Sequence, residues 1–229
     1  MNFSTDDAGH IIIIDENGHP IAGTITEEEI INALISTNHY VAKDAIGLNI
    51  NYTNRSFERT QGAAELEMGA DFNRYVMYGG RTRCNVADDG TITAFYGDNN
   101  YTEDGSNGQV MVYQPKFYYK RYIHTAEELF RGKIVHSETL ILSATKQPGF
   151  KLAPIFKDEL EYVLLPAFDG SIVNNKLASI AGQKPVNNIS IIEAEAKATA
   201  RGEGWHIMTM AAESANQMLQ IIEYGSMNG

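Results

Sequence analysis

The sequence contains little cysteine and no long apolar stretch. Cys84 is the one cysteine in 229 residues, so no internal disulfide can form and a disulfide-held secreted scaffold is excluded. The longest aliphatic run, Ile11 to Ile14, is far shorter than a bilayer span, and the N-terminus lacks the pattern of a signal peptide. We therefore expect a protein that is made in a cytoplasm and does not enter a membrane, with Cys84 as a buried, unreactive thiol.

Positive charge is also scarce. Lys and Arg number 18 against 29 Asp and Glu, which gives a net charge of -11 and a pI near 5.0. The basic residues are scattered, so no basic patch interrupts the negative field, and nucleic acid is not an expected partner.

Residue patterns typical of catalysis are missing as well. The six histidines are scattered, no histidine lies near Cys84, and no Ser-His-Asp arrangement can be assigned. No Walker-type or dinucleotide glycine pattern is present. We therefore predict no catalytic residues and no required cofactor.

What the sequence does contain is enough apolar material for a folded core, since 43% of its residues are hydrophobic. Residues 1–45 predict a small hairpin-helix unit. The run from Ile11 to Ile14 is followed by a turn at residues 15–18 and a second short strand at 20–22, and Thr26 with Glu29 forms a capping box that opens a helix. This unit is too small to bury much surface alone, so it packs on a neighbouring subunit or on its own domain.

Residues 46–229 predict an α+β domain whose middle is rich in strands. We expect strands at 91–96, 109–120, 134–141 and 161–165, with a turn at Asp89-Gly90 and an interruption at Pro115. Two helices are expected near the end, at 193–201 and from a Thr209 cap to Tyr224. The apolar residues of the second helix recur at helical spacing and predict a buried face: Ala212, Ala215, Met218, Leu219 and Ile222.

Four segments in this order resemble a known family. They are RTRCNVADDG at 81–90, DGSNGQVMV at 104–112, SIAGQKP at 179–185 and GEGWHIM at 202–208. Together they are similar to tail or virion structural proteins of bacteriophages from gut bacteria. The last segment and the helix after it also resemble the C-type-lectin-like domain of phage tropism determinants and relatives of formylglycine-generating enzymes. The resemblance covers residues 48–229.

The resemblance implies a fold and a function. The fold is a C-type-lectin-like domain over residues 46–229, which is expected to be incomplete at its C-terminus because such domains usually continue beyond this helix. The function is that of a non-catalytic phage tail structural or host-receptor-binding protein, located in the virion and assembled in the host cytoplasm. The implied partners are other tail subunits, a homo-oligomer for which a trimer is favoured, and a host surface glycan or protein. Copper oxidase activity is excluded, because it needs a cysteine pair.

Several residues are candidates for binding or for the core. Asp98, Glu103 and Asp104 lie in a loop dense in oxygen ligands that could hold Ca²⁺, although the loop lacks the EF-hand pattern and a solvated turn is favoured. Tyr101 and Tyr118 are candidate ligand or partner contacts. We expect Phe117 in the core. In the resembling fold, Trp205 is also a core residue rather than a sugar-stacking one.

Two alternatives to the structural function stay open. The first is a carbohydrate-binding module that uses the acidic loop, a bound cation and exposed tyrosines. The second is a glycan-cleaving tail enzyme, which needs two carboxylates across a groove. The loop carboxylates cannot be paired from the sequence, so the first alternative is preferred.

Overall fold

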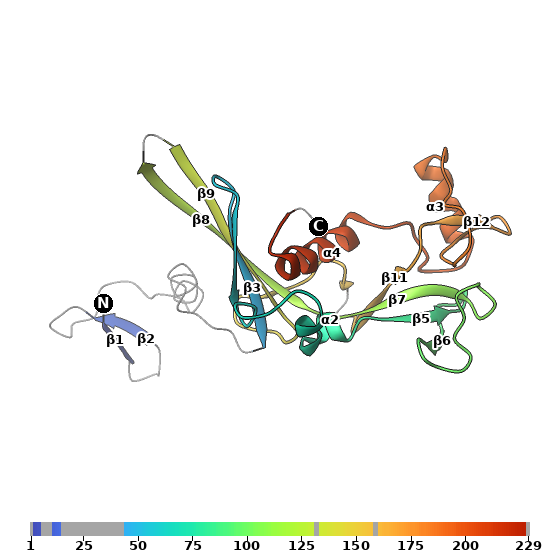
Figure 1. Ribbon diagram of the computed structural model, residues 1–229, viewed down its shortest axis with the longest axis horizontal. Helices are drawn as coiled ribbons and strands as arrows, with labels where there is room; N and C mark the ends of the chain where they lie inside the picture. The colour runs from blue at the N-terminus through green and yellow to red at the C-terminus, as the bar shows by residue number, and fades with distance from the viewer. Residues whose placement is uncertain (1, 6–10, 15–43, 131–132, 158–159, 228–229) are drawn as a thin grey trace.

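The structure is a computed structural model that describes residues 2–5, 11–14, 44–130, 133–157 and 160–227. It is a mixed fold of antiparallel sheets and a few helices, as the sequence predicts for its α+β class. A five-stranded sheet and a four-stranded sheet follow each other along the long axis of the molecule (Figure 1). No helix among the described residues is long and apolar enough to cross a membrane.

The N-terminal residues form a separate two-stranded sheet. Strand β1 (Asn2–Thr5) pairs antiparallel with β2 (Ile11–Ile14), so the isoleucine run is a strand as predicted. Its partner within the described residues precedes it in the chain, whereas we expected a partner at 20–22. The strand expected at 20–22 and the helix expected from Thr26 lie outside the described residues.

The five-stranded sheet has the order β10-β8-β9-β3-β4, with every neighbouring pair antiparallel. Its strands are β3 (Ala45–Asn51), β4 (Ser56–Gln61), β8 (Tyr118–Phe130), β9 (Lys133–Ser143) and β10 (Lys151–Leu152). Alternate residues of β3 and β9 point to one face and are buried there, among them Ile46, Leu48 and Leu140. That face supports the main core.

Helix α4 (Met210–Tyr224) covers this face of the sheet. The Thr209 side chain accepts a hydrogen bond from the Ala212 amide at its start, and Gly225 ends it in the left-handed conformation at φ 59°. Of the five residues of the predicted buried face, Met218 is partly buried and the other four are buried: Ala212, Ala215, Leu219 and Ile222. The predicted second helix is therefore confirmed in both extent and orientation.

Two short helical turns complete the core beneath α4. The 3-10 helix η1 (Ala70–Arg74) and helix α2 (Val76–Gly79) bury Phe72 and Tyr78, whose rings meet edge to face at 5.2 Å. The Tyr78 hydroxyl donates to the Leu219 carbonyl at 2.7 Å, which ties α2 to the middle of α4. Burial is the main cause that raises the pKa of Tyr78 far above its ordinary value, so the phenol stays neutral.

The four-stranded sheet has the order β11-β7-β5-β6. Its strands are β5 (Thr82–Val86), β6 (Ile92–Phe95), β7 (Gln109–Pro115) and β11 (Tyr162–Pro166), and beside it lie the hairpin β12 (Ser171–Val173) with β13 (Lys176–Ala178) and helix α3 (Ile191–Thr199). The turn at Asp89-Gly90 is confirmed: Gly90 has φ 86° and the Thr91 amide donates to Asp89 Oδ1.

The chain passes directly from one sheet to the other between β7 and β8. We predicted one interrupted strand at 109–120, but β7 ends at Pro115 and β8 begins at Tyr118 in a different sheet. The pairing of β7 with β5 ends at Tyr113, Pro115 has no amide hydrogen to donate to another strand, and Phe117 between the strands is fully buried against Phe156. The interruption therefore marks the junction of the two sheets.

Candidate functional site

The loop between β6 and β7 contains the three carboxylates that we considered as calcium ligands. Asp98 Oδ2 accepts from the Phe95 amide at 2.8 Å, and Asp104 Oδ1 accepts from the amide and the hydroxyl of Ser106. The Ser106 hydrogen bonds are the main cause that lowers the pKa of Asp104. Asp104 thus closes an Asx-turn, and Asp98 bonds back to the end of β6.

Glu103, the third of these carboxylates, has a different environment. Its Oε1 atom lies 2.5 Å from Arg83 Nη1 and 3.1 Å from the Tyr101 hydroxyl. The structure therefore joins two predicted residues directly, because the Tyr101 hydroxyl donates to Glu103, and it adds Arg83 as a second partner of the same oxygen. Within the described ranges, no group of three His, Cys, Asp or Glu side chains is arranged to hold a metal.

The two candidate tyrosines differ in their surroundings. Tyr101 is half-buried, and its ring meets that of exposed Tyr96 edge to face at 5.4 Å. Tyr118 is half-buried on the face of β8 opposite the main core, where it packs against the small cluster of Ala45, Ile141 and Phe150. Phe117, which we expected in the core, is fully buried in the main cluster.

Trp205 packs against the two central strands of the four-stranded sheet, β5 and β7. Its ring is half-buried against the cluster of Cys84, Val86 and Met111, and its Nε1 donates to the Asp88 carbonyl at 2.8 Å. The Arg201 guanidinium lies 5.6 Å from the ring centre. This position makes Trp205 a packing residue that covers the sheet rather than a fully enclosed core residue.

The lone thiol is inside this small cluster. Cys84 is fully buried on β5, and burial raises its pKa to about 11. A thiol with that pKa is neutral at pH 7 and is a poor nucleophile.

Helix α4 has a hollow on each of its flanks. On the sheet side, a groove of about 310 Å³ is lined by residues of three strands, the loop after β10 and α4: Ile50, Tyr119, Arg121, Glu138, Leu140, Pro154, Ser214, Gln217, Met218 and Ile221. Buried Glu138 accepts from Arg121 Nε at 2.5 Å and from the Tyr52 hydroxyl at 2.8 Å. These hydrogen bonds engage both carboxylate oxygens, so we assign this polar network a structural role at the end of the core.

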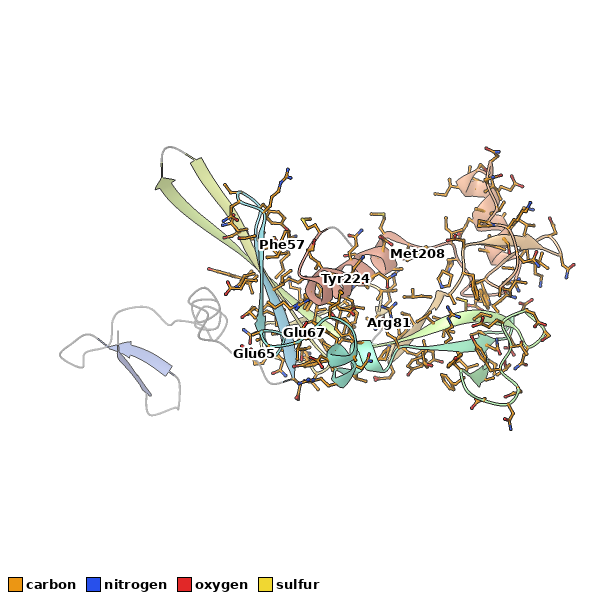
Figure 2. The ribbon with its side chains drawn as sticks, in the orientation of Figure 1. Phe57, Glu65, Glu67, Arg81, Met208 and Tyr224 are labelled. Atoms are coloured by element: carbon orange, nitrogen blue, oxygen red, sulfur yellow. The ribbon has the colours of Figure 1, made fainter. Side chains whose placement is uncertain are left out.

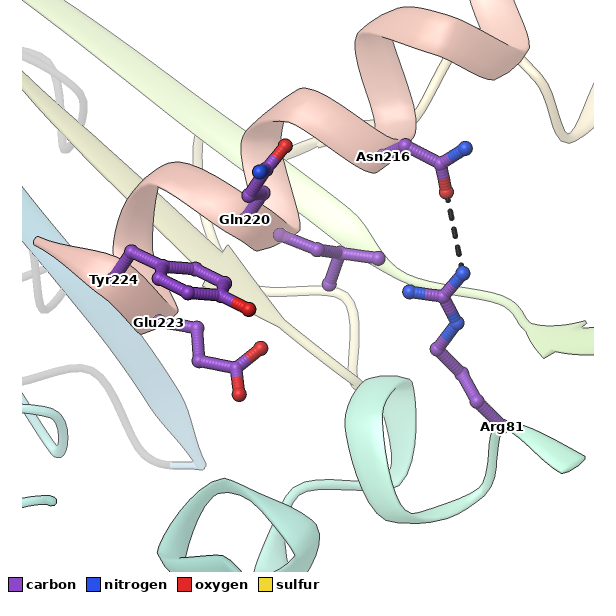
Figure 3. Close-up of a pocket in the computed structure, with 6 residues that line it drawn as sticks. Arg81, Asn216, Gln220, Glu223 and Tyr224 are labelled. Atoms are coloured by element: carbon purple, nitrogen blue, oxygen red, sulfur yellow. Dashed lines mark hydrogen bonds between the residues drawn. The ribbon is translucent and has the colours of Figure 1, made fainter. Parts of the chain in front are cut away.

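The pocket on the other flank of α4 is more polar. It has a volume of about 250 Å³ and lies between α4 and the segment that links α2 to β5 (Figures 2 and 3). Its lining residues are Arg81, Asn216, Leu219, Gln220, Glu223 and Tyr224. Arg81 Nη2 donates to Asn216 Oδ1 at 3.3 Å, the one hydrogen bond between these side chains in Figure 3.

Sequence analysis did not identify this pocket, because its arginine lies far from α4 in the chain. The signal present in the sequence is a polar stripe on α4 at spacings of four and three residues: Asn216, Gln220 and Glu223. Such a stripe predicts an exposed helix face, and only the fold brings Arg81 against it.

The hairpin of β8 and β9 extends beyond the rest of its sheet (Figure 1). The pairing of β3 with β9 ends at Asn51 and Ser137, whereas β8 and β9 continue to pair as far as Phe130 and Lys133. Among the described residues, no third strand pairs with residues 125–130 or 133–136. We call the paired residues 125–130 and 133–136 the arm.

Comparisons with models of protein families, with curated proteins and with solved structures find no match for this chain.

Proposed function

We propose that the chain is a non-catalytic structural component of a bacteriophage tail that acts through subunit assembly and recognition of the host surface. The observation that carries this proposal is the arm, a two-stranded projection whose backbone pairs only with itself among the described residues. The four resembling sequence segments support the assignment to a virion.

The arm is suited to subunit contact because of what a projecting hairpin exposes. An isolated two-stranded hairpin is marginally stable in water, and its outer edges present unpaired amide and carbonyl groups. A second subunit that covers such an edge supplies both hydrogen bonds and apolar contact. In a closed ring of identical chains, each arm would dock on the next copy, and a trimer is the ring that we favour.

The finer assignment of residues 46–229 to a C-type-lectin-like domain is part of the same proposal. It is supported by the antiparallel sheets, by α3 and α4 on either side of the Gly-x-Gly-Trp-His segment, and by the packing of Trp205 against a sheet. A domain of this kind offers a stable framework while its surface loops vary.

Removal of the arm tests the proposal. His124 and Ser137 are directly paired, so an Asn-Gly turn can join them in place of residues 125–136 without changing the register. We expect the full chain to be an oligomer by light scattering and the shortened chain to be a monomer with an unchanged circular dichroism spectrum. A full chain that is monomeric, or a shortened chain that keeps the same oligomeric mass, would contradict assembly through the arm.

The carbohydrate-binding alternative loses its support at the acidic loop. Asp98 and Asp104 are engaged in local turns, and Glu103 is paired with Arg83 and Tyr101. A cation would have to displace these contacts before it could bind. If that alternative rests on calcium, a chelator will abolish binding of the chain to host glycans.

A further inference from the structure

We propose that the pocket between Arg81 and α4 binds a single uncharged polyhydroxylated ring, such as the terminal sugar of a glycan. This inference goes beyond assembly and does not depend on the arm. It rests on the charges, the amides and the aromatic ring of the pocket, and on the hydrogen bonds that hold the backbone of α4.

The charges of the pocket favour a neutral ligand. Arg81 and Glu223 both line it, and Figure 3 marks no interaction between these two described side chains. Burial lowers the pKa of Arg81, but Glu223 acts in the opposite direction, and an arginine remains charged at neutral pH. An anion would meet Glu223 and a cation would meet Arg81. A hydroxyl group can donate to the carboxylate and accept from the guanidinium, so it complements both.

The amide side chains add donors and acceptors at regular intervals. Asn216 and Gln220 lie on successive turns of α4 and line the same pocket. Arg81 donates to Asn216 Oδ1, so the hydrogens of the Asn216 amide group are not used in this contact. Planar amide, carboxylate and guanidinium groups around one hollow can each engage neighbouring hydroxyls of a sugar ring.

Tyr224 supplies an apolar surface beside these polar groups. Its side chain lines the pocket at the end of α4, and the residue is 45% exposed. An aromatic ring that is partly open to water can pack against the C–H face of a sugar. The volume of about 250 Å³ is below the ~300–1,000 Å³ typical of sites for drug-sized ligands, so it suits one ring.

The backbone of α4, which forms one wall of the pocket, is held by hydrogen bonds from outside the helix. The Tyr78 hydroxyl holds the Leu219 carbonyl, and the Arg59 guanidinium donates to the carbonyls of Ile222 and Glu223. Leu219 and Ile222 anchor the same turns of α4 in the core. Binding therefore requires little ordering of the backbone, and that lowers its entropic cost.

A titration of the full chain followed by amide NMR tests this inference. The probes are uncharged hexoses and N-acetylhexosamines, with a uronic acid and a free zwitterionic amino acid as charged comparisons. We expect at least one uncharged sugar to shift the amides of α4 around Gln220, with a dissociation constant of about 1 mM. Shifts caused only by the amino acid or only by the uronic acid would overturn the choice of a neutral ligand, and no shifts with any probe would overturn the site.

Matched variants locate the site. Glu223→Gln removes a charged acceptor and is expected to weaken binding about tenfold, and Gln220→Ala about fivefold. Gln217→Ala changes the same residue type on the opposite flank of α4 and should leave the affinity unchanged. Equal losses from Gln217→Ala and Gln220→Ala would overturn the assignment to this pocket. The chain without its arm should bind the sugar as well as the full chain does, so failure here is distinguishable from failure of the assembly proposal.

Discussion

The two sheets of this molecule are stabilised in different ways. The five-stranded sheet buries one face under α4 and the short helices, in a large apolar cluster that includes Leu48, Phe72 and Leu219. The four-stranded sheet has a much smaller apolar cluster of Cys84, Val86 and Met111. Apolar burial stabilises a structure without directional requirements. The stability of the first sheet should therefore depend on the volume of its buried side chains, and that of the second on individual polar contacts.

Those polar contacts are numerous in the second sheet. Buried Asn85 donates to the Thr102 carbonyl at 2.7 Å and accepts from the Thr102 amide at 2.9 Å, which fixes the loop after β6. Ser179 and Gln109 fix the segment after β13 in the same manner, since the Ser179 amide donates to Gln109 Oε1. A region held by separate directional hydrogen bonds can open locally, whereas a region held by one continuous core opens as a unit.

The largest effect is expected from a cavity in the first region. Leu219→Ala removes a side chain that is 1% exposed and lies at the centre of the contact between α4 and the sheet. We expect a loss of about 3 kcal/mol in the free energy of unfolding, measured by chemical denaturation, because the packed surroundings cannot fill the space. Ile191→Ala is the control: Ile191 is 72% exposed, and its truncation should change stability by less than about 0.5 kcal/mol.

A smaller and more local effect is expected from the second region. The Ser179 hydroxyl donates to the Val110 carbonyl at 2.7 Å and accepts from the amides of Ala167 and Phe168 at 3.1 and 3.0 Å. Ser179→Ala leaves these groups without that partner, at an expected cost of about 2 kcal/mol. Hydrogen exchange should accelerate at Ala167 and Phe168 and stay unchanged in α4. Equal acceleration in both sheets would show that the two regions unfold as one.

The sequence predicts those parts of the molecule whose signals are local. The apolar spacing of α4, its Thr209 cap and the glycine that ends it are all within one segment, so its extent and buried face followed directly. The turn at Asp89-Gly90 and the strands near 92–95, 133–143 and 162–166 were predictable for the same reason. The predicted helix at 193–201 is present two residues earlier, where Ser190 caps it.

The sequence does not predict features that depend on distant partners. The apolar run at 109–120 gave no indication that its two halves join different sheets, because strand pairing is a non-local choice. The acidic loop resembles a cation site in composition, yet Arg83 and the local amides already engage its carboxylates. The pocket beside α4 was missed because Arg81 reaches Asn216 only through the tertiary fold.

The smallest expected effect concerns the ion pairs at the edge of the second sheet. Asp88 accepts from Lys176 Nζ at 2.7 Å and from Arg201 Nη1 at 2.6 Å. Partial burial alone would raise the pKa of Asp88, but the hydrogen bonds from Lys176 and Arg201 outweigh it and lower the pKa. Asp88→Asn should cost less than about 1 kcal/mol at neutral pH, since the carboxylate is 43% exposed and solvent screens the pairs.

Trp205, the one tryptophan of the chain, reports on this small effect, because its Nε1 donates to the Asp88 carbonyl. A carboxyl with a lowered folded-state pKa stabilises the fold above its unfolded-state pKa of about 3.9, and the stabilisation is lost as the pH falls through the lower folded-state value. We therefore expect Trp205 fluorescence to change in that acid range in the native chain. In Asp88→Asn it should be shifted already at neutral pH, and Asp89→Asn, which alters only the adjacent turn, should keep the native profile. If both variants keep that profile, the ion pairs of Asp88 do not stabilise the packing of Trp205, and the second region depends on its buried hydrogen bonds alone.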